Sequence, residues 1–143
     1  MRRYLIAGNW KMNTDRASAV ELTTAICEKA SGTKDVDLLV CPPSVYLAPV
    51  ADKLAGCPVA LGAQNMCGDD NGAFTGEVSH TMLSDVGAEY VILGHSERRT
   101  LFGETDADVN KKTLKALEAG IAPIVCLGEQ LDEREAGRTA DVV

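Results

Sequence analysis

Short apolar runs alternate with longer amphipathic segments along this chain, and that alternation constrains the fold more than any other feature. The apolar runs predict β-strands at residues 4–7, 36–41, 59–63, 89–93 and 121–127. They are nearly continuous in apolar character, as expected of strands covered on both faces. Amphipathic helices between successive strands imply parallel pairing with right-handed crossovers. The sequence therefore predicts an α/β fold with a parallel sheet, either a doubly wound open sheet or part of a (β/α) barrel.

Helix-start and helix-stop signals divide the segments between the strands. We expect one helix to begin after Thr14 or Asp15 and to end near Gly32. A second helix is expected from Leu47, because Pro49 would cost about 3 kcal/mol in a helix interior. Further helices are expected at residues 79–87, 97–102, 105–120 and 129–138. We expect the strand at residues 4–7 to stop at Gly8.

Length and charge exclude several classes of protein. The 143 residues suggest one domain spanning residues 1–143, and no apolar stretch approaches the ~20 residues of a membrane-spanning helix. The net charge of −7 argues against a nucleic acid or an anionic membrane as the main partner. Basic side chains are concentrated in residues 1–34, which suits a small anion. We therefore expect a soluble, cytoplasmic protein.

The chain lacks the usual cofactor and metal signatures. Its five cysteines form no C-x-x-C pair, so we expect small apolar side chains in a reducing compartment rather than a metal or redox motif. The acidic run at residues 69–72 fails as a calcium loop, because Cys67 and Val78 would stand where carboxylates are required. The Gly-rich nucleotide-binding motifs are also missing. No metal is expected.

Polar residues follow the predicted strands, where a parallel α/β sheet carries its binding residues. Lys11 follows the first strand and is suited to a small anion, although residue statistics alone favour a solvated surface lysine. His95 follows the fourth strand, where a histidine either caps a helix or serves as a neutral hydrogen-bond donor. Glu97 is followed by Arg98 and Arg99, and the three together are also typical of a surface charge cluster.

Taken jointly, these segments resemble one family. The motifs are Asn9-Trp10-Lys11-Met12-Asn13, Gln64-Asn65, Phe74-Thr75-Gly76-Glu77, Gly94-His95-Ser96-Glu97-Arg98-Arg99 and Cys126-Leu127-Gly128-Glu129. In this order and spacing they resemble triosephosphate isomerase closely, across the whole 143 residues. The resemblance implies an eight-fold (β/α) barrel, of which this chain is the N-terminal portion, ending in the fifth β/α unit.

The resemblance also implies an activity and the residues that carry it. The family interconverts dihydroxyacetone phosphate and glyceraldehyde 3-phosphate through an enediolate, without a cofactor. Lys11 would bind the substrate and offset its charge, and Asn9 would orient both. His95 would polarise the carbonyl group as a neutral electrophile, an established feature of this family. Glu97 would belong to the supporting polar network.

A further implication of the resemblance is a homo-oligomer. In the family, the loop around Thr75 inserts into a neighbouring subunit and supports its Asn9 and Lys11. We therefore expect Thr75, Gly76, Glu77 and Arg98 to contact a second subunit.

The family's general base is a glutamate after the sixth strand, which we expect to lie beyond Val143 with the mobile lid and the phosphate-binding loops. Neither Glu97 nor Glu129 belongs to the base motif. We therefore expect the isolated chain to be inactive. The alternatives are a non-catalytic half-barrel that self-associates through its strand edges at residues 4–7 and 121–127, and a phosphate-binding module using Lys11 alone.

Overall fold

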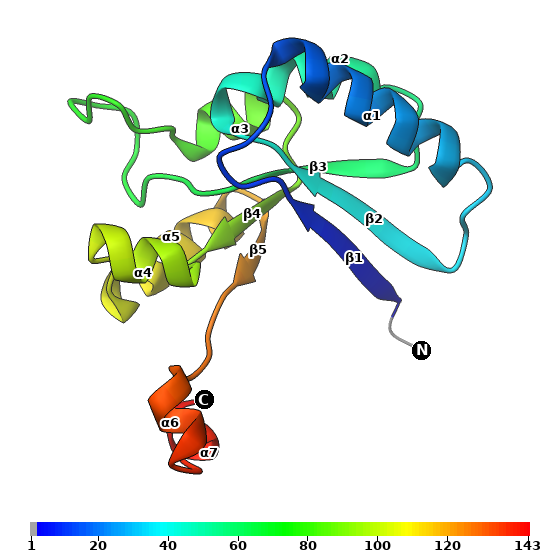
Figure 1. Ribbon diagram of the computed structural model, residues 1–143. Coiled ribbons are helices and arrows are strands. Elements are labelled where there is room, and N and C mark those ends of the chain that lie inside the picture. Colours follow the sequence, from blue (N-terminus) through cyan, green and yellow to red (C-terminus); the bar gives the residue numbers. More distant parts are fainter. Residues whose placement is uncertain (1–2) are drawn as a thin grey trace.

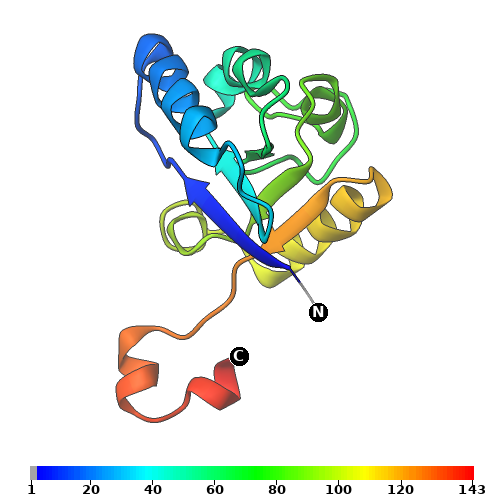
Figure 2. The same cartoon turned by 90° about the vertical axis from the view of Figure 1, so that its right-hand side faces the viewer.

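The computed structural model describes residues 3–143 and contains one five-stranded parallel sheet with the strand order β1-β2-β3-β4-β5 (Figure 1). The strands are β1 (Tyr4–Asn9), β2 (Val36–Cys41), β3 (Val59–Ala63), β4 (Tyr90–Leu93) and β5 (Ala122–Val125). The sheet curls, and the helices that connect the strands lie on its outer side (Figure 2). The predicted partial (β/α) barrel is confirmed, and the open doubly wound sheet is excluded.

The two edge strands differ in length from their predictions. β1 does not stop at Gly8, because Gly8 pairs with Val40 and the ladder continues to Asn9 opposite Cys41. β5 is shorter than residues 121–127, since its pairing with β4 ends at Leu93 opposite Val125. Within residues 3–143, neither β1 nor β5 has a strand on its other side.

The helices largely follow the sequence signals. They are α1 (Arg16–Ala30), α2 (Leu47–Leu54), α3 (His80–Asp85), α4 (Ser96–Phe102) and α5 (Asp106–Glu118), and a short 3₁₀ turn, η1 (Ser44–Tyr46), precedes α2. Asp15 caps α1 by accepting the backbone N–H of Ser18 at 2.8 Å. Pro49 is the third residue of α2, where a backbone N–H has no partner within the helix to lose. No helix of residues 3–143 is long and apolar enough to span a membrane.

The predicted helix at residues 129–138 is wrong in part. Two short helices replace it, α6 (Leu131–Glu135) and α7 (Thr139–Val142). Gly137 lies between them with a φ of +70°, a left-handed conformation that ends a helix. Both helices extend away from the sheet (Figures 1 and 2).

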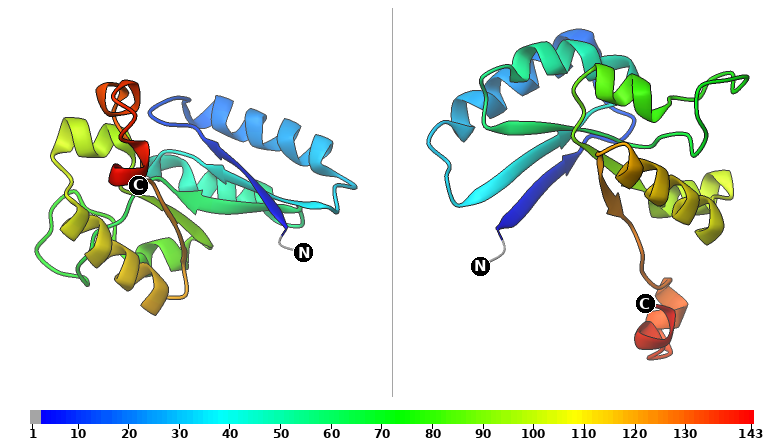
Figure 3. Two further views of the ribbon diagram at one scale, coloured as in Figure 1. Left: turned by 90° about the horizontal axis from the view of Figure 1, so that it is seen from below. Right: turned by 180° about the vertical axis from the view of Figure 1, so that it is seen from behind.

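The main core is built from side chains of the sheet and of the helices that cover its outer face. Figure 3 shows these helices along that face of the sheet. Alternate strand residues point outward into this core, and the helices contribute small or branched residues. Its strand and helix members include Val40, Leu61, Val91, Leu93, Ala19, Val50, Leu83, Val109 and Ala116. A smaller cluster on the inner face contains Leu39, Cys41 and Ile92.

Two cysteines are joined, and the expectation that all five are free apolar side chains is wrong for this pair. Cys27 of α1 and Cys57, between α2 and β3, form a disulfide with Cα atoms 5.6 Å apart. Packing of α1 against α2 brings these positions together, and no spacing rule in the sequence reveals it. Cys41, Cys67 and Cys126 are free thiols.

Candidate active site

The segment after β1 has a fixed backbone conformation. Asn9 accepts the backbone N–H of Lys11 through its side-chain oxygen at 2.9 Å. The amide of Gln64, at the end of β3, donates to the carbonyl oxygens of Lys11 at 2.9 Å and Cys41 at 2.8 Å. Lys11 has a φ of +54°, which is uncommon outside glycine. Hydrogen bonds to the backbone N–H and to the carbonyl oxygen of Lys11 therefore stabilise this uncommon φ value. The same bonds fix the position from which the Lys11 side chain extends.

Lys11 forms an ion pair with Glu97. Its Nζ lies 2.6 Å from Oε1 of Glu97, and about half of each side chain is exposed. The hydrogen bond from Lys11 lowers the pKa of Glu97, and the charge of Lys11 lowers it further. Glu97 is therefore a carboxylate that holds the ammonium group in place.

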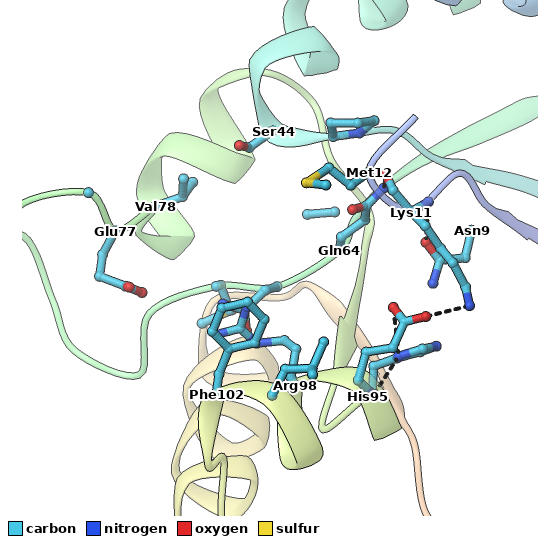
Figure 4. A pocket seen from close by; sticks show the side chains of 17 residues that line it. Asn9, Lys11, Met12, Ser44, Gln64, Glu77, Val78, His95, Arg98 and Phe102 are labelled. Atoms are coloured by element: carbon cyan, nitrogen blue, oxygen red, sulfur yellow. Dashed lines mark hydrogen bonds and ion pairs between the residues drawn. The ribbon is translucent and has the colours of Figure 1, made fainter. Parts of the chain in front are cut away.

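His95 is the N-cap residue of α4. Its Nδ1 accepts the backbone N–H of Glu97 at 3.2 Å, which requires that this nitrogen carries no proton. The ring is then neutral, with its proton on Nε2. Figure 4 shows the side chains of Lys11 and His95 extending toward one another from different strand ends. This arrangement places a hydrogen-bond donor beside a cation.

Gly94 allows the chain to turn between β4 and α4. Its φ is +67°, and a Cβ here would lie 2.8 Å from Val109 and 2.9 Å from Arg99. Arg99 donates to the carbonyl oxygen of Gly94 at 2.8 Å and to that of Cys126 at 3.2 Å. His95 is thus positioned by backbone that only glycine tolerates at this position.

A cavity of about 600 Å³ lies at the carboxyl ends of the strands. Every site residue named from the sequence lines it except Thr75, and the cavity wall includes Asn9, Lys11, Gly76, Glu77, His95, Glu97 and Arg98. Thr75 is exposed on the neighbouring loop. The structure therefore brings together residues that are far apart in the sequence. A pocket with an ammonium, a neutral imidazole and amide groups suits a small oxygen-rich anion.

Arg98, in the cavity wall, also belongs to a second group of polar side chains, which includes Glu104 and Lys112. It lies 3.4 Å from Glu104 and stacks over the ring of Phe102 at 5.0 Å. Lys112 pairs with the same carboxylate and donates to Asn65 at 3.0 Å. Burial raises the pKa of Glu104, but the hydrogen bond and charge of Lys112, with Arg98, outweigh this and lower it.

Sequence reasoning missed Glu104 and Lys112 altogether and assigned no role to Gln64. The only available signal was the resemblance itself, which includes Gln64 and Asn65. Burial of this charged pair depends on the packing of α5 against β4 and β5, which no local sequence pattern reveals. Among residues 3–143, no group of three or more His, Cys, Asp or Glu side chains is arranged to hold a metal ion.

Known proteins share this sequence along its length. The family model for triosephosphate isomerase matches residues 4–143. The chain is similar to the triosephosphate isomerase of Rhodopirellula baltica, with 54% identity over 142 residues. It is also 53% identical to that of Magnetococcus marinus and 51% identical to that of Alkaliphilus oremlandii.

These matches cover 99–100% of this chain but only 56–57% of each relative. The chain therefore spans little more than half the length of the curated relatives it matches. Because the family model covers nearly all of its residues, the chain belongs to the triosephosphate isomerase family.

Proposed function

We propose that residues 1–143 form a single unit carrying the cation and electrophile of a triosephosphate isomerase active site. A protein completed by the rest of the barrel interconverts dihydroxyacetone phosphate and glyceraldehyde 3-phosphate, without a cofactor. The observation that carries this proposal is the convergence of Lys11 and His95 on one cavity, with Glu97 between them. We propose that the reaction takes place in the cytoplasm.

The two groups have complementary electrostatic roles. The Nε2–H of His95 donates to the substrate carbonyl oxygen, and this hydrogen bond strengthens as negative charge develops on that oxygen in the enediolate. The ammonium of Lys11 leaves Glu97 and offsets the charge of the phosphate and the enediolate. Asn9 holds the backbone from which Lys11 projects. Since the positions are fixed before substrate binds, little reorganisation accompanies the reaction.

Proton transfer from carbon needs a carboxylate base, and Glu97 is poorly suited to that role. Its pairing with Lys11 lowers its pKa, and a weaker base abstracts a carbon-bound proton less readily. We propose that the base lies outside residues 1–143, as in the family. These residues alone then give no turnover.

We also propose that a second copy of the chain contacts the loop containing Thr75, Gly76 and Glu77. All three residues are exposed, and Gly76 and Glu77 lie at the cavity wall beside Arg98. A homo-oligomer would cover this loop and one side of the cavity together.

The catalytic proposal is tested by adding the remaining barrel. A chimera joining residues 1–143 to the C-terminal part of a complete relative is expected to isomerise triose phosphate, whereas residues 1–143 alone are not. His95→Ala is expected to lower kcat by about 10²–10³-fold, and Lys11→Ala to impair both KM and kcat.

The matched controls are His80→Ala and Lys29→Ala, which remove the same groups outside the cavity. Near-parental kcat/KM in both site variants contradicts the assignment. Turnover of ~1–10³ s⁻¹ by residues 1–143, free of contaminating enzyme, contradicts the missing base.

A second candidate function, a non-catalytic self-associating half-barrel, is favoured by the exposed strand edges. Tyr4 is 74% and Ile6 58% exposed on β1, and Leu127 is 65% exposed after β5. Unpaired strand edges with apolar side chains promote association. Light scattering from micromolar concentration upward, with near-UV circular dichroism, measures it. Ile6→Lys is expected to weaken association, whereas Val45→Lys, also at an exposed site but on η1, is not. A folded monomer that binds no hydrophobic dye contradicts this candidate.

A further inference from the structure

The disulfide between Cys27 and Cys57 lies on the helical side of the fold. Cys27 is near the C-terminal end of α1, and Cys57 is in the turn that connects α2 to β3. The segment that the bond encloses contains all of β2, η1 and α2. The Cα atoms of the two cysteines are 5.6 Å apart, which is within the usual range for a disulfide.

Packing independent of the disulfide holds the two cysteines together. Ala30 of α1 and Val50 and Leu54 of α2 are buried in the same core cluster, with Cys27 and Cys57 packed against its rim. The helices therefore remain side by side when the bond is open. Two thiols held in this way have a high effective concentration for each other, which favours closing the bond.

Accessibility distinguishes this pair from two of the other cysteines. Cys27, Cys57 and Cys126 are half-buried, whereas Cys41 and Cys67 are buried. Burial raises the pKa of Cys41 to about 12 and also raises that of Cys126. Thiol exchange requires a thiolate that a small molecule can reach, so these two thiols react poorly.

We propose that Cys27 and Cys57 form a reversible redox site, oxidised by exchange with a low-molecular-weight disulfide and reduced by the corresponding thiol. One cysteine thiolate attacks the small disulfide and forms a mixed disulfide, releasing one small thiolate, which takes up a proton. The second cysteine thiolate attacks the protein sulfur of that mixed disulfide and releases the second small thiol. The protein loses two electrons and two protons, and the small disulfide gains both.

The Cys27–Cys57 site is distant from the cavity, so we expect its oxidation to change the stability of the fold. Cys27 is eleven residues beyond Arg16, about 16 Å along α1 from the end nearest Lys11. Neither cysteine lines the cavity. Closing the loop restricts the unfolded chain, so oxidation is expected to reduce the unfolded population by about 30-fold or more.

Thiol trapping tests the pairing. The 143-residue chain is equilibrated in glutathione buffers of increasing oxidising strength, quenched with acid, alkylated and mapped by mass spectrometry. The expected result is one linked pair, Cys27 with Cys57, that reopens when the glutathione ratio is reversed, with the other three cysteines alkylated throughout. Cys67→Ser is expected to preserve the link, and Cys27→Ser to abolish it. Links scattered among the five cysteines, or no link at any ratio, overturn the proposal.

Pulse proteolysis across a urea series tests the effect on stability. Oxidised wild-type chain is expected to resist cleavage better than reduced wild type by the fold-change above. The Cys27→Ser/Cys57→Ser variant is expected to match reduced wild type under both conditions. Because the main comparison uses one sequence in two redox states, it does not depend on whether a variant folds. Equal resistance of oxidised and reduced wild type overturns the proposal.

Discussion

The centre of the sheet and its edges are similar in composition and differ sharply in burial. Leu39 of β2 is 2% exposed and Val91 of β4 is fully buried, whereas Tyr4 and Ile6 of β1 are mostly exposed. Strands β2 to β4 have neighbours on both sides, while β1 and β5 have one each among residues 3–143. Apolar character alone therefore does not determine how well the side chains of a strand are covered, and the edge strand β1 is covered less well than the central strands.

The candidate site spans both regions. Asn9 ends the edge strand β1 and Lys11 follows it, whereas His95 follows the central strand β4. Gln64, at the end of β3, connects them by donating to the carbonyl oxygen of Lys11. The position of the cation thus depends on a hydrogen bond from the better-packed region.

The largest expected effect tests the difference in burial directly. Leu39→Ala removes a fully covered side chain and is expected to lower the free energy of unfolding by about 3–5 kcal/mol. Leu5→Ala makes the same change on β1, where the side chain is 39% exposed, and is expected to cost less than about 1 kcal/mol. Urea denaturation measures both. Equal costs would show that something covers the edge in solution.

A smaller loss of stability is expected from changing the buried carboxylate of Glu104, which lies between α4 and α5. Glu104→Gln leaves Lys112 without its carboxylate partner and is expected to cost about 2–3 kcal/mol at pH 7. The control is Glu118→Gln on the surface of α5, where the expected change is within about 0.5 kcal/mol.

The pH dependence of stability provides a second measurement on Glu104. Its folded-state pKa is below the ordinary value of 4.5, so the stabilisation is fully present above about pH 4.5. It is lost as the pH falls through the lower folded-state pKa. The Gln variant is expected to lose less stability than wild type over this range, and parallel curves would contradict the assignment.

The smallest expected effect compares two threonines at helix N-termini. Thr105 caps α5 by accepting the backbone N–H of Asp108, and Thr105→Ala is expected to cost about 1 kcal/mol. Thr139 begins α7, which extends away from the sheet, and Thr139→Ala is expected to change global stability by less than about 0.5 kcal/mol. Thermal unfolding followed by circular dichroism measures both. A similar loss in both would mean that α7 unfolds together with the core.

Elements with strong periodicity and clear caps were predictable. The bounds of β2 and β3 agree with their apolar runs, and the cap residues Asp15 and Thr105 stand directly before α1 and α5. β1 was underestimated because Gly8 weakens a strand in isolation but is paired here on β2. The helix at residues 129–138 failed because a continuous polar pattern obscured the stop at Gly137.

Within the candidate site, prediction depended on the family resemblance. It was needed to identify Lys11 and His95, because a lysine or a histidine after a strand, taken alone, also suits a surface or capping role. It gave no role to Gln64, since that role lies in two hydrogen bonds to backbone oxygens that only the folded sheet brings within reach. The same holds for Glu104 and for the Cys27–Cys57 pair, whose partners are set by packing between elements.

The left-handed backbone of Lys11 has a consequence for evolution at that position. Glycine adopts a φ of +54° without steric cost, so Lys11→Gly would relieve backbone strain on the order of 1 kcal/mol while deleting the ammonium group. Relief of that strain would favour the substitution, whereas selection for the anion binding proposed for Lys11 would oppose it. Position 11 is therefore a place where backbone strain and the proposed function conflict. A library selected only for soluble expression should drift there toward glycine.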